Sequence, residues 1–139
     1  MYKDIGSFDG SRVFLGTFGK VVVDGEEMAA VSEVEAIVEN DKQELDVMGS
    51  TWTHHKGGQK SGAGTITGFK LNSSAIKRGF DRFDMITSLD DPEAEGYETI
   101  RYKNCMADSI MLANAVAGEV VEEEIPFTFE GYELLDPID

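Results

Sequence analysis

The sequence predicts a mainly β fold: a β-sandwich or barrel with one flanking α-helix and a long loop or extended hairpin. Segments in which apolar and polar residues alternate recur along the chain, and alternation is typical of strands with one buried face. Only one segment has the apolar spacing of a helix. The length of 139 residues fits a single domain, and a hydrophobic content of 41% argues against disorder.

Residues 1–20 are rich in glycine and aromatic residues, and we expect them to form an N-terminal arm or short strand. Residues 21–139 should then form a single β domain. Residues 20–23 are typical of a strand, since β-branched residues suit a pleated, half-buried surface. Asp24-Gly25 follows directly and is a strong signal for a hairpin turn, so a return strand is expected after it.

The segment at residues 33–39 alternates almost perfectly between apolar and acidic side chains. Successive side chains of a strand point to opposite faces. One face therefore carries Val34, Ala36 and Val38, and the other carries Glu33, Glu35 and Glu39. The first face should be core and the second should be wet and negative.

About residues 41–64 should form the long loop or extended hairpin. Alternation resumes briefly at residues 44–48, and a glycine-rich stretch follows. Connections of this length tend to be functional or disordered. Trp52 argues against disorder, because a large aromatic side chain normally packs against a partner.

The one predicted helix covers about residues 73–83. Residues 72–74 supply candidates for its N-cap. Ile76, Phe80 and Phe83 fall at positions i, i+4 and i+7, which places them on one apolar stripe of an amphipathic helix.

The remainder of the chain is predicted to return to strands. Two strands are expected at residues 83–89 and 98–102, joined by an acidic turn, and a third closes the chain over residues 121–135. Pro126 lies within the closing strand and marks an edge or a bulge, because it donates no ladder hydrogen bond. The pattern of residues 109–116 fits either a strand or a helix.

Twelve basic and 27 acidic residues give a net charge of −15, and this charge is unevenly spread. Residues 47–80 contain no acidic residue, although an even spread would place about six or seven there. The same segment holds both histidines and five basic residues, so it carries +5 while the rest of the chain carries −20. The sequence thus predicts an acidic body with one basic segment.

The charge and the hydropathy exclude several classes of function. An acidic molecule repels phosphate and anionic lipid, which argues against a general nucleic-acid binder and a membrane-surface protein. No run of about 18 apolar residues is present, and the first residues lack the apolar core of a signal peptide, so we expect a cytoplasmic start and no membrane insertion. The single cysteine, Cys105, excludes an internal disulfide framework.

Candidate catalytic and metal-binding motifs are weak. His54 and His55 are adjacent and point to opposite sides of an extended chain, so they do not easily hold one metal ion. The turn at residues 91–96 resembles the start of a calcium loop, but Tyr102 stands where a bidentate acid is required. Residues 57–62 lack the spacing of a phosphate loop. We therefore expect no enzyme, no cofactor and no metal site.

The same features favour a protein that assembles with itself. A mostly β domain has edge strands, which invite pairing with other chains. A basic loop on an acidic body suits contact between copies in a fixed register. Contacts of that kind generate rings or filaments when they join two different surfaces.

A series of short motifs runs in order from about residue 21 to residue 135. Residues 23–29 form the first motif and residues 122–130 the last; between them stand Glu35, Ala36, Val38, Glu39, Lys42, Glu44, Met48, Gly49, Thr53, His55, Lys56, Gly62, Gly64 and Thr65. This ordered set resembles the tail tube proteins of contractile-tailed phages, of the PBSX prophage type, which are related to the tubes of phage-tail-like bacteriocins.

The resemblance implies a structural subunit of an inner tail tube, located in a virion tail or tail-like particle and assembled in the bacterial cytoplasm. In this family six subunits form a ring, and rings stack into a tube inside a contractile sheath. Sheets of neighbouring subunits join into one barrel around the lumen, which encloses a tape-measure protein and later conducts DNA. The segment at about residues 41–64 is similar to the one that contacts the adjacent ring.

The acidic composition fits such a conduit, because an acidic lumen repels the phosphate backbone and lets DNA pass without binding. We expect five glutamates to contribute to the lumen face: Glu33, Glu35, Glu39, Glu122 and Glu124. The alternative for each is a wet face on the exterior.

Five loop residues are expected at an inter-subunit or inter-ring contact: Trp52, His54, His55, Lys56 and Lys60. Tryptophan and basic side chains suit a loop that docks on an acidic neighbour. The alternative is a loop that is disordered in the free subunit and orders on assembly. Two other classes of function stay open, a monomeric acidic β domain that binds calcium or another ligand and a small hydrolase.

Overall fold

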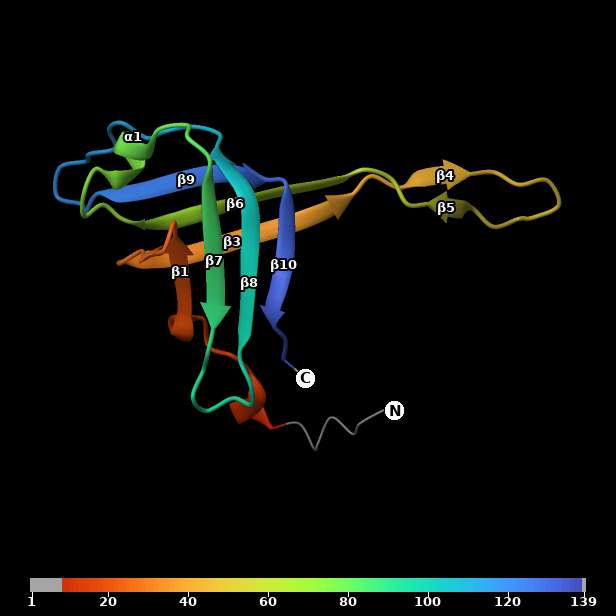
Figure 1. Ribbon diagram of the computed structural model, residues 1–139, viewed down its shortest axis with the longest axis horizontal. Helices are drawn as coiled ribbons and strands as arrows, with labels where there is room; N and C mark the ends of the chain where they lie inside the picture. Colours follow the sequence, from red (N-terminus) through yellow and green to blue (C-terminus); the bar gives the residue numbers. More distant parts are fainter. Residues whose placement is uncertain (1–8, 139) are drawn as a thin grey trace.

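The computed structural model describes residues 9–138, and these residues form a mainly β protein with one short α-helix and two 3-10 turns, at Gly10–Arg12 and Gly16–Phe18 (Figure 1). The strands are β1 (Gly19–Val23), β2 (Glu26–Glu27), β3 (Val31–Asn40), β4 (Gln43–Leu45), β5 (His54–Lys56), β6 (Lys60–Phe69), β7 (Phe83–Leu89), β8 (Glu98–Ala107), β9 (Glu122–Phe129) and β10 (Gly131–Asp136), and the helix is α1 (Ser74–Arg78). The predicted fold class is confirmed.

The body consists of two antiparallel layers whose strands cross at a steep angle (Figure 1). The first layer has the order β2-β1-β7-β8-β10, and the second has the order β9-β6-β3. They join where the end of β8 pairs with β9, through Met106 with Thr128 and Ala107 with Phe127. Such orthogonal packing buries one face of each layer and leaves the other outside.

The core lies between the two layers and is built from the inward side chains of both. Phe127 is fully buried and lies between Phe83 and Phe129, with ring centroids 6.3 Å and 6.2 Å away. Tyr102 packs edge-on against Phe129 at 5.1 Å, and its hydroxyl lies 3.1 Å from the hydroxyl of Thr87. Aromatic pairs in this arrangement stabilise a core beyond their buried area.

Glycines on the inward face of β6 leave room for these rings. Gly62 pairs with Phe129 and Gly64 pairs with Phe127 across the ladder. A Cβ at Gly64 would meet the carbonyl oxygen of Glu35 and would lie 2.7 Å from the Phe127 ring. Neighbouring aromatic rings therefore fill the space that glycine leaves inside this strand.

The described part of the predicted N-terminal arm is tied to the body by Asp91. Its buried carboxylate accepts the backbone N–H of Leu15 at 3.0 Å and that of Glu93 at 2.9 Å. Residues 9–18 thus lie against the turn between β7 and β8, and the expected arm of residues 1–20 ends in β1. Residues 1–8 of that expected arm lie outside the described residues.

The helix is shorter than predicted. It ends at Arg78 because Gly79 leaves the helical conformation with φ of 61° and ψ of −129°, a region open to glycine but not to residues with a Cβ. Phe83, the third member of the predicted stripe, instead begins β7 and is buried, with the Arg78 guanidinium 5.0 Å from its ring centroid.

Two other predictions near the C-terminus need correction. The closing strand predicted over residues 121–135 breaks at Glu130, where the chain passes from β9 in one layer to β10 in the other. Residues 109–116 form neither of the two predicted elements and belong to an irregular connection between β8 and β9. Pro126 lies inside β9, and its carbonyl accepts the N–H of Asp108 at 2.8 Å.

Substitution of Gly64 should destabilise the fold. The Gly64→Ala variant should lose about 1–3 kcal/mol of unfolding free energy, because its Cβ overlaps the Glu35 carbonyl and the Phe127 ring. Gly16→Ala is the control, since a Cβ there meets nothing within 4 Å. Urea denaturation measures both, and equal stabilities of the two variants would contradict this packing.

Candidate functional site

The outward face of the second layer gathers acidic side chains. Alternation along β3 directs Glu33, Glu35 and Glu39 away from the core, and alternation along β9 does the same for Glu122 and Glu124. All five are exposed. We call these five residues the acidic face, and they are the glutamates that the sequence grouped as candidates for one surface.

The strand register brings these glutamates together across β6. Thr67 pairs with Glu33 on one side and with Glu124 on the other, so two carboxylates stand two strand spacings apart, or about 10 Å. Between them β6 presents the small side chains of Ser61, Ala63, Thr65 and Thr67 on this face, and Phe69 at its end lies opposite Glu122. Asp108 lines the same surface beside Glu35 and Glu39.

The acidic face carries no compensating cation among residues 9–138. The ion pairs in that range join Arg12 to Glu95, Lys70 to Glu123, Arg82 to Glu130, Arg101 to Asp84 and Lys103 to Glu133. Glu123 lies on the inward side of β9 and pairs with Lys70 at 3.9 Å. Within the described residues, the negative charge of the acidic face is therefore not neutralised by a salt bridge and is exposed to solvent.

The outward face of the first layer carries both positive and negative side chains, unlike the acidic face. Arg101 pairs with Asp84 at 2.9 Å, and Lys103 pairs with Glu133 at 3.8 Å. Lys20 is exposed on the neighbouring β1. One outer surface of the molecule is thus balanced in charge. The other carries acidic side chains and no cation from the described residues, although the exposed Ile37 and the neutral Pro126 lie among them.

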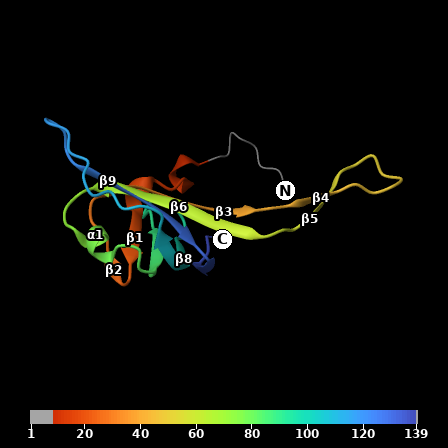
Figure 2. The same ribbon diagram turned by 90° about the horizontal axis from the view of Figure 1, so that it is seen from above.

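Residues 41–59 form an arm that continues the β3–β6 hairpin beyond the body (Figures 1 and 2). Within it β4 pairs with β5, Gln43 lying opposite Lys56 and Leu45 opposite His54. The expected loop is therefore an extended hairpin, the second of the two forms that the sequence predicted.

The tip of the arm is held in shape by local hydrogen bonds. Ser50 donates its N–H to the carbonyl of Val47 at 3.2 Å, closing a turn in which Gly49 has φ of 85°. The Ser50 hydroxyl accepts the N–H of Trp52 at 3.2 Å and lies 3.1 Å from Nε2 of His54. These hydrogen bonds connect the turn at Gly49 to the start of β5.

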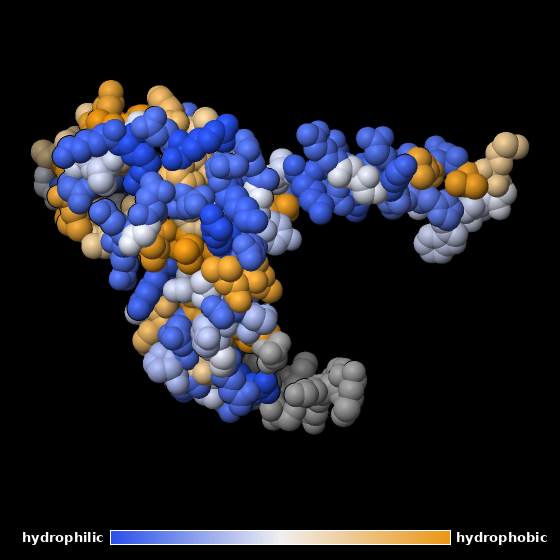
Figure 3. All heavy atoms as spheres, in the orientation of Figure 1, coloured by the Kyte–Doolittle hydropathy of each residue, from blue (hydrophilic) through white to orange (hydrophobic). Residues whose placement is uncertain are grey.

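Apolar side chains at this tip face solvent, which Figure 3 shows as orange atoms at the end of the arm. Met48 is 99% exposed and Trp52 is 80% exposed, and Leu45 and Val47 are exposed beside them. Isolated apolar residues are common on protein surfaces, but a cluster at the end of a projecting arm indicates a contact site.

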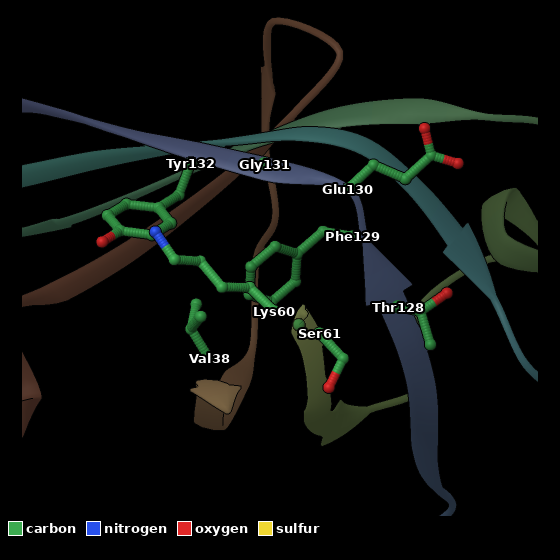
Figure 4. Close-up of a pocket in the computed structure, with 9 residues that line it drawn as sticks. Val38, Lys60, Ser61, Thr128, Phe129, Glu130, Gly131 and Tyr132 are labelled. Carbon is green, nitrogen blue, oxygen red and sulfur yellow. The ribbon is translucent and has the colours of Figure 1, made fainter. Parts of the chain in front are cut away.

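Four of the five predicted contact residues lie on the arm, and Lys60 lies at its base. Lys60 lines a pocket of about 490 Å³ with Val38, Phe129 and Tyr132, at the place where the two layers diverge (Figure 4). Trp52, His54, His55 and Lys56 do not converge on one point, and the adjacent histidines of β5 point to opposite sides. Their geometry suits contact with a surface.

The expectation of one basic loop on an acidic body is wrong in its electrostatic part. Lys70 pairs with Glu123, and Arg78 covers the Phe83 ring, so the cations of residues 47–80 are dispersed over the fold. The segment 41–60 balances Asp41, Glu44 and Asp46 with Lys42, Lys56 and Lys60. Sequence reasoning missed the apolar tip, although Val47, Met48 and Trp52 around Gly49 were a usable signal.

The described residues offer little chemistry beyond these surfaces. No group of three or more histidine, cysteine or acidic side chains in residues 9–138 is arranged to hold a metal ion. Asp91, the first acid of the calcium-like turn, is engaged by two backbone N–H groups. Over the same residues, no helix is long and apolar enough to cross a membrane.

The chain is similar to known proteins over almost its whole length. The family described as "Phage tail tube protein" matches residues 6–136. Two proteins of Bacillus subtilis (strain 168), "Phage-like element PBSX protein XkdM" and "Uncharacterized protein YqbM", are each 36% identical to this chain over 129 residues. These alignments cover 86% of this chain and 88% of each relative.

Solved structures of tube assemblies share the fold. The anti-feeding prophage cap (AFP tube terminating cap) matches with a TM-score of 0.73 and 13% identity over 97% of both chains. A chain of the PVC sheath–tube complex, an extracellular contractile injection system in its extended state, matches with a TM-score of 0.71 and 14% identity over 98% of this chain and all of that one. The SPP1 tail tube gives 0.69 and 15%, over 91% of this chain and 81% of that one.

The family match and the 36% identity confirm the resemblance that the ordered motifs indicated. They also identify a structural protein and not an enzyme, as the lack of a catalytic constellation predicted. The acidic face, the projecting arm and the crossed β layers are thus features of a tube subunit: the chain belongs to the phage tail tube protein family.

Proposed function

We propose that six copies of this chain form a ring, that rings stack into a tube, and that the acidic face lines the lumen through which DNA passes. The observation that carries the proposal is the collection of Glu33, Glu35, Glu39, Glu122 and Glu124 on one outward face without a cation. A water-filled lumen keeps these charges hydrated and repels the phosphate backbone, so DNA does not adhere.

The contrast between the two outer surfaces supports this orientation. Burying an unpaired carboxylate in a protein interface costs several kcal/mol, roughly, so the acidic face is a poor surface for contact with another protein. The ion-paired surface around Arg101 and Lys103 carries both signs of charge and suits a protein partner. We therefore place the first layer outside, toward a contractile sheath, and the second layer toward DNA and a tape-measure protein.

Free strand edges support closure of a ring. Within the described residues β3 pairs with β6 alone, so its second edge has no strand beside it. At the other margin of this layer, only Phe127 and Thr128 of β9 pair with β8. Pairing of β3 from one copy with the open part of β9 from the next would continue the layer around the lumen.

The arm is proposed as the contact between rings. It projects beyond the body and ends in exposed Met48 and Trp52, which gain from burial against another subunit. Trp52, His54, His55 and Lys56 would lie in this contact, with Lys60 at the base of the arm. A ring of six copies would carry six times −15, or about −90, so assembly should also respond to salt.

The direction of the arm can be tested at its joint with the body. There the Gly58 N–H donates to Oδ1 of Asn40 at 3.1 Å, and a Cβ on Gly58 would collide with the Asp41 carbonyl. The Gly58→Ala variant should keep the urea midpoint of the body but fail to form tubes in electron micrographs. Gly57→Ala, where a Cβ meets nothing within 4 Å, should polymerise normally. Normal tubes from Gly58→Ala would contradict the role of the arm.

The lumen assignment can be tested with DNA and nuclease. Tubes of the wild-type protein should not bind duplex DNA at low salt, whereas tubes of Glu33→Lys/Glu124→Lys should bind it and protect it from nuclease, because the lumen would then attract phosphate. Asp90→Lys/Glu93→Lys, with the same change in net charge, alters exposed acids of the β7–β8 turn and should protect no DNA. Complete digestion of DNA bound by the first variant would place the acidic face outside the tube.

A further inference from the structure

The end of the body opposite the arm carries a second exposed apolar surface. Phe69 ends β6, and Leu71, which is 65% exposed, follows it; Val116 and the 72%-exposed Val120 come from the irregular β8–β9 connection. The two segments adjoin, because Lys70 donates its N–H to the Val121 carbonyl at 3.0 Å. Glu26 and Glu27 of β2 line one hollow with Phe69 and Leu71. We call Glu26, Glu27, Phe69, Leu71, Val116 and Val120 the far-end surface.

The far-end surface and the arm lie at opposite ends of one strand. The arm leaves the body where Lys60 begins β6, and Phe69 ends the same strand, about 30 Å away. The arm points away from the body at its own end (Figure 1). A copy therefore does not reach its own far-end surface with its own arm tip, and any contact between the two joins different copies.

The two surfaces complement each other in chemistry. The arm tip presents Met48 and Trp52, followed along β5 by His54, His55 and Lys56. The far-end surface presents apolar side chains beside the two carboxylates of Glu26 and Glu27. In such a contact the apolar side chains would meet at the centre, and Lys56 would face the carboxylates of Glu26 and Glu27 at the margin. Glu44 and Asp46 keep the arm as a whole from being basic.

We propose that the arm tip of one copy docks on the far-end surface of a copy in the next ring. The inference rests on the proposed function, since it names the partner surface of the arm. The contact joins two different surfaces, so each copy donates one arm and accepts one arm. Because the partner lies in the next ring, repetition links copies from ring to ring in an open series and does not close a dimer. The pocket of Val38 and Tyr132, at the base of the arm, is the competing acceptor.

Cross-linking between introduced cysteines tests the contact. The native Cys105 does not interfere, because it is buried and burial, aided by the negative charge of Asp84, raises the pKa of its thiol to about 11. Tubes of Met48→Cys/Leu71→Cys, treated with a short bis-maleimide, should give a ladder of trimers and longer species on a denaturing gel. Met48→Cys/Leu134→Cys, with its second cysteine on β10 near the competing pocket, should give none.

The outcomes separate this inference from the proposed function. Tubes that cross-link only through Leu134→Cys, or through neither pair, would overturn the far-end contact and leave the tube assignment intact. Absence of tubes from the wild-type protein under all conditions would overturn both. Cross-linked dimers from the Met48→Cys single variant would show that tips meet tips and would also contradict the proposal.

A charge exchange gives a second readout that needs no cysteine. Glu27→Lys should raise the critical concentration for tube assembly several-fold, because it places a cation opposite Lys56 of β5. Adding Lys56→Glu in the same chain should restore most of the loss. Glu133→Lys/Lys103→Glu, which exchanges an ion pair on the first layer, is the matched control and should assemble as the wild type does. Failure of Lys56→Glu to rescue Glu27→Lys would count against the contact.

Discussion

The antiparallel ladder between β3 and β6 is the interaction on which the rest of the structure depends. Its register runs from Val31 opposite Gly68 to Asn40 opposite Lys60, with one irregularity near Glu33. This register directs Glu33, Glu35 and Glu39 of β3 outward into the acidic face, with Ile37 between them. The same two strands continue into the arm, so one hairpin sets both the charged surface and the direction of the proposed stacking contact.

A single copy of this chain leaves much apolar surface exposed. Its accessible surface is 10287 Å², against roughly 7,100 Å² expected for a compact monomer of 15.2 kDa. The buried core is small, and exposed apolar side chains lie at the arm tip, at the far-end surface and beside β10. An assembled tube would cover these apolar surfaces. Contacts between subunits would then add to the stability that the small core of one copy provides.

Sequence patterns correctly predicted the strands and turns that are determined by a few consecutive residues. The alternation of residues 33–37 and the Asp24-Gly25 turn both appear in the structure, because period and turn chemistry act over a few residues. Val38, predicted to face the core, is exposed where β3 leaves the body toward the arm. The helix was overextended because Phe83 fits a helical stripe as well as a strand, and only the core shows that its ring packs on Phe127. The break at Glu130 was also missed because it depends on a distant segment: after Glu130 the chain turns to pair with β8 as β10.

The sequence predicted most of the residues of the candidate site but not how the fold brings them together, because that depends on strand pairing between distant segments. The glutamates of β3 and β9 are far apart in sequence, and their common face depends on β6 pairing with both strands. The charge of residues 47–80 was misleading, because a sum over a segment does not show that Lys70 meets Glu123. A helical reconstruction of the assembled tube by electron cryomicroscopy would show which side chains surround the lumen. We predict that Glu33, Glu35, Glu39, Glu122 and Glu124 surround the lumen; a lumen surrounded by Lys20, Arg101 and Lys103 would contradict the account.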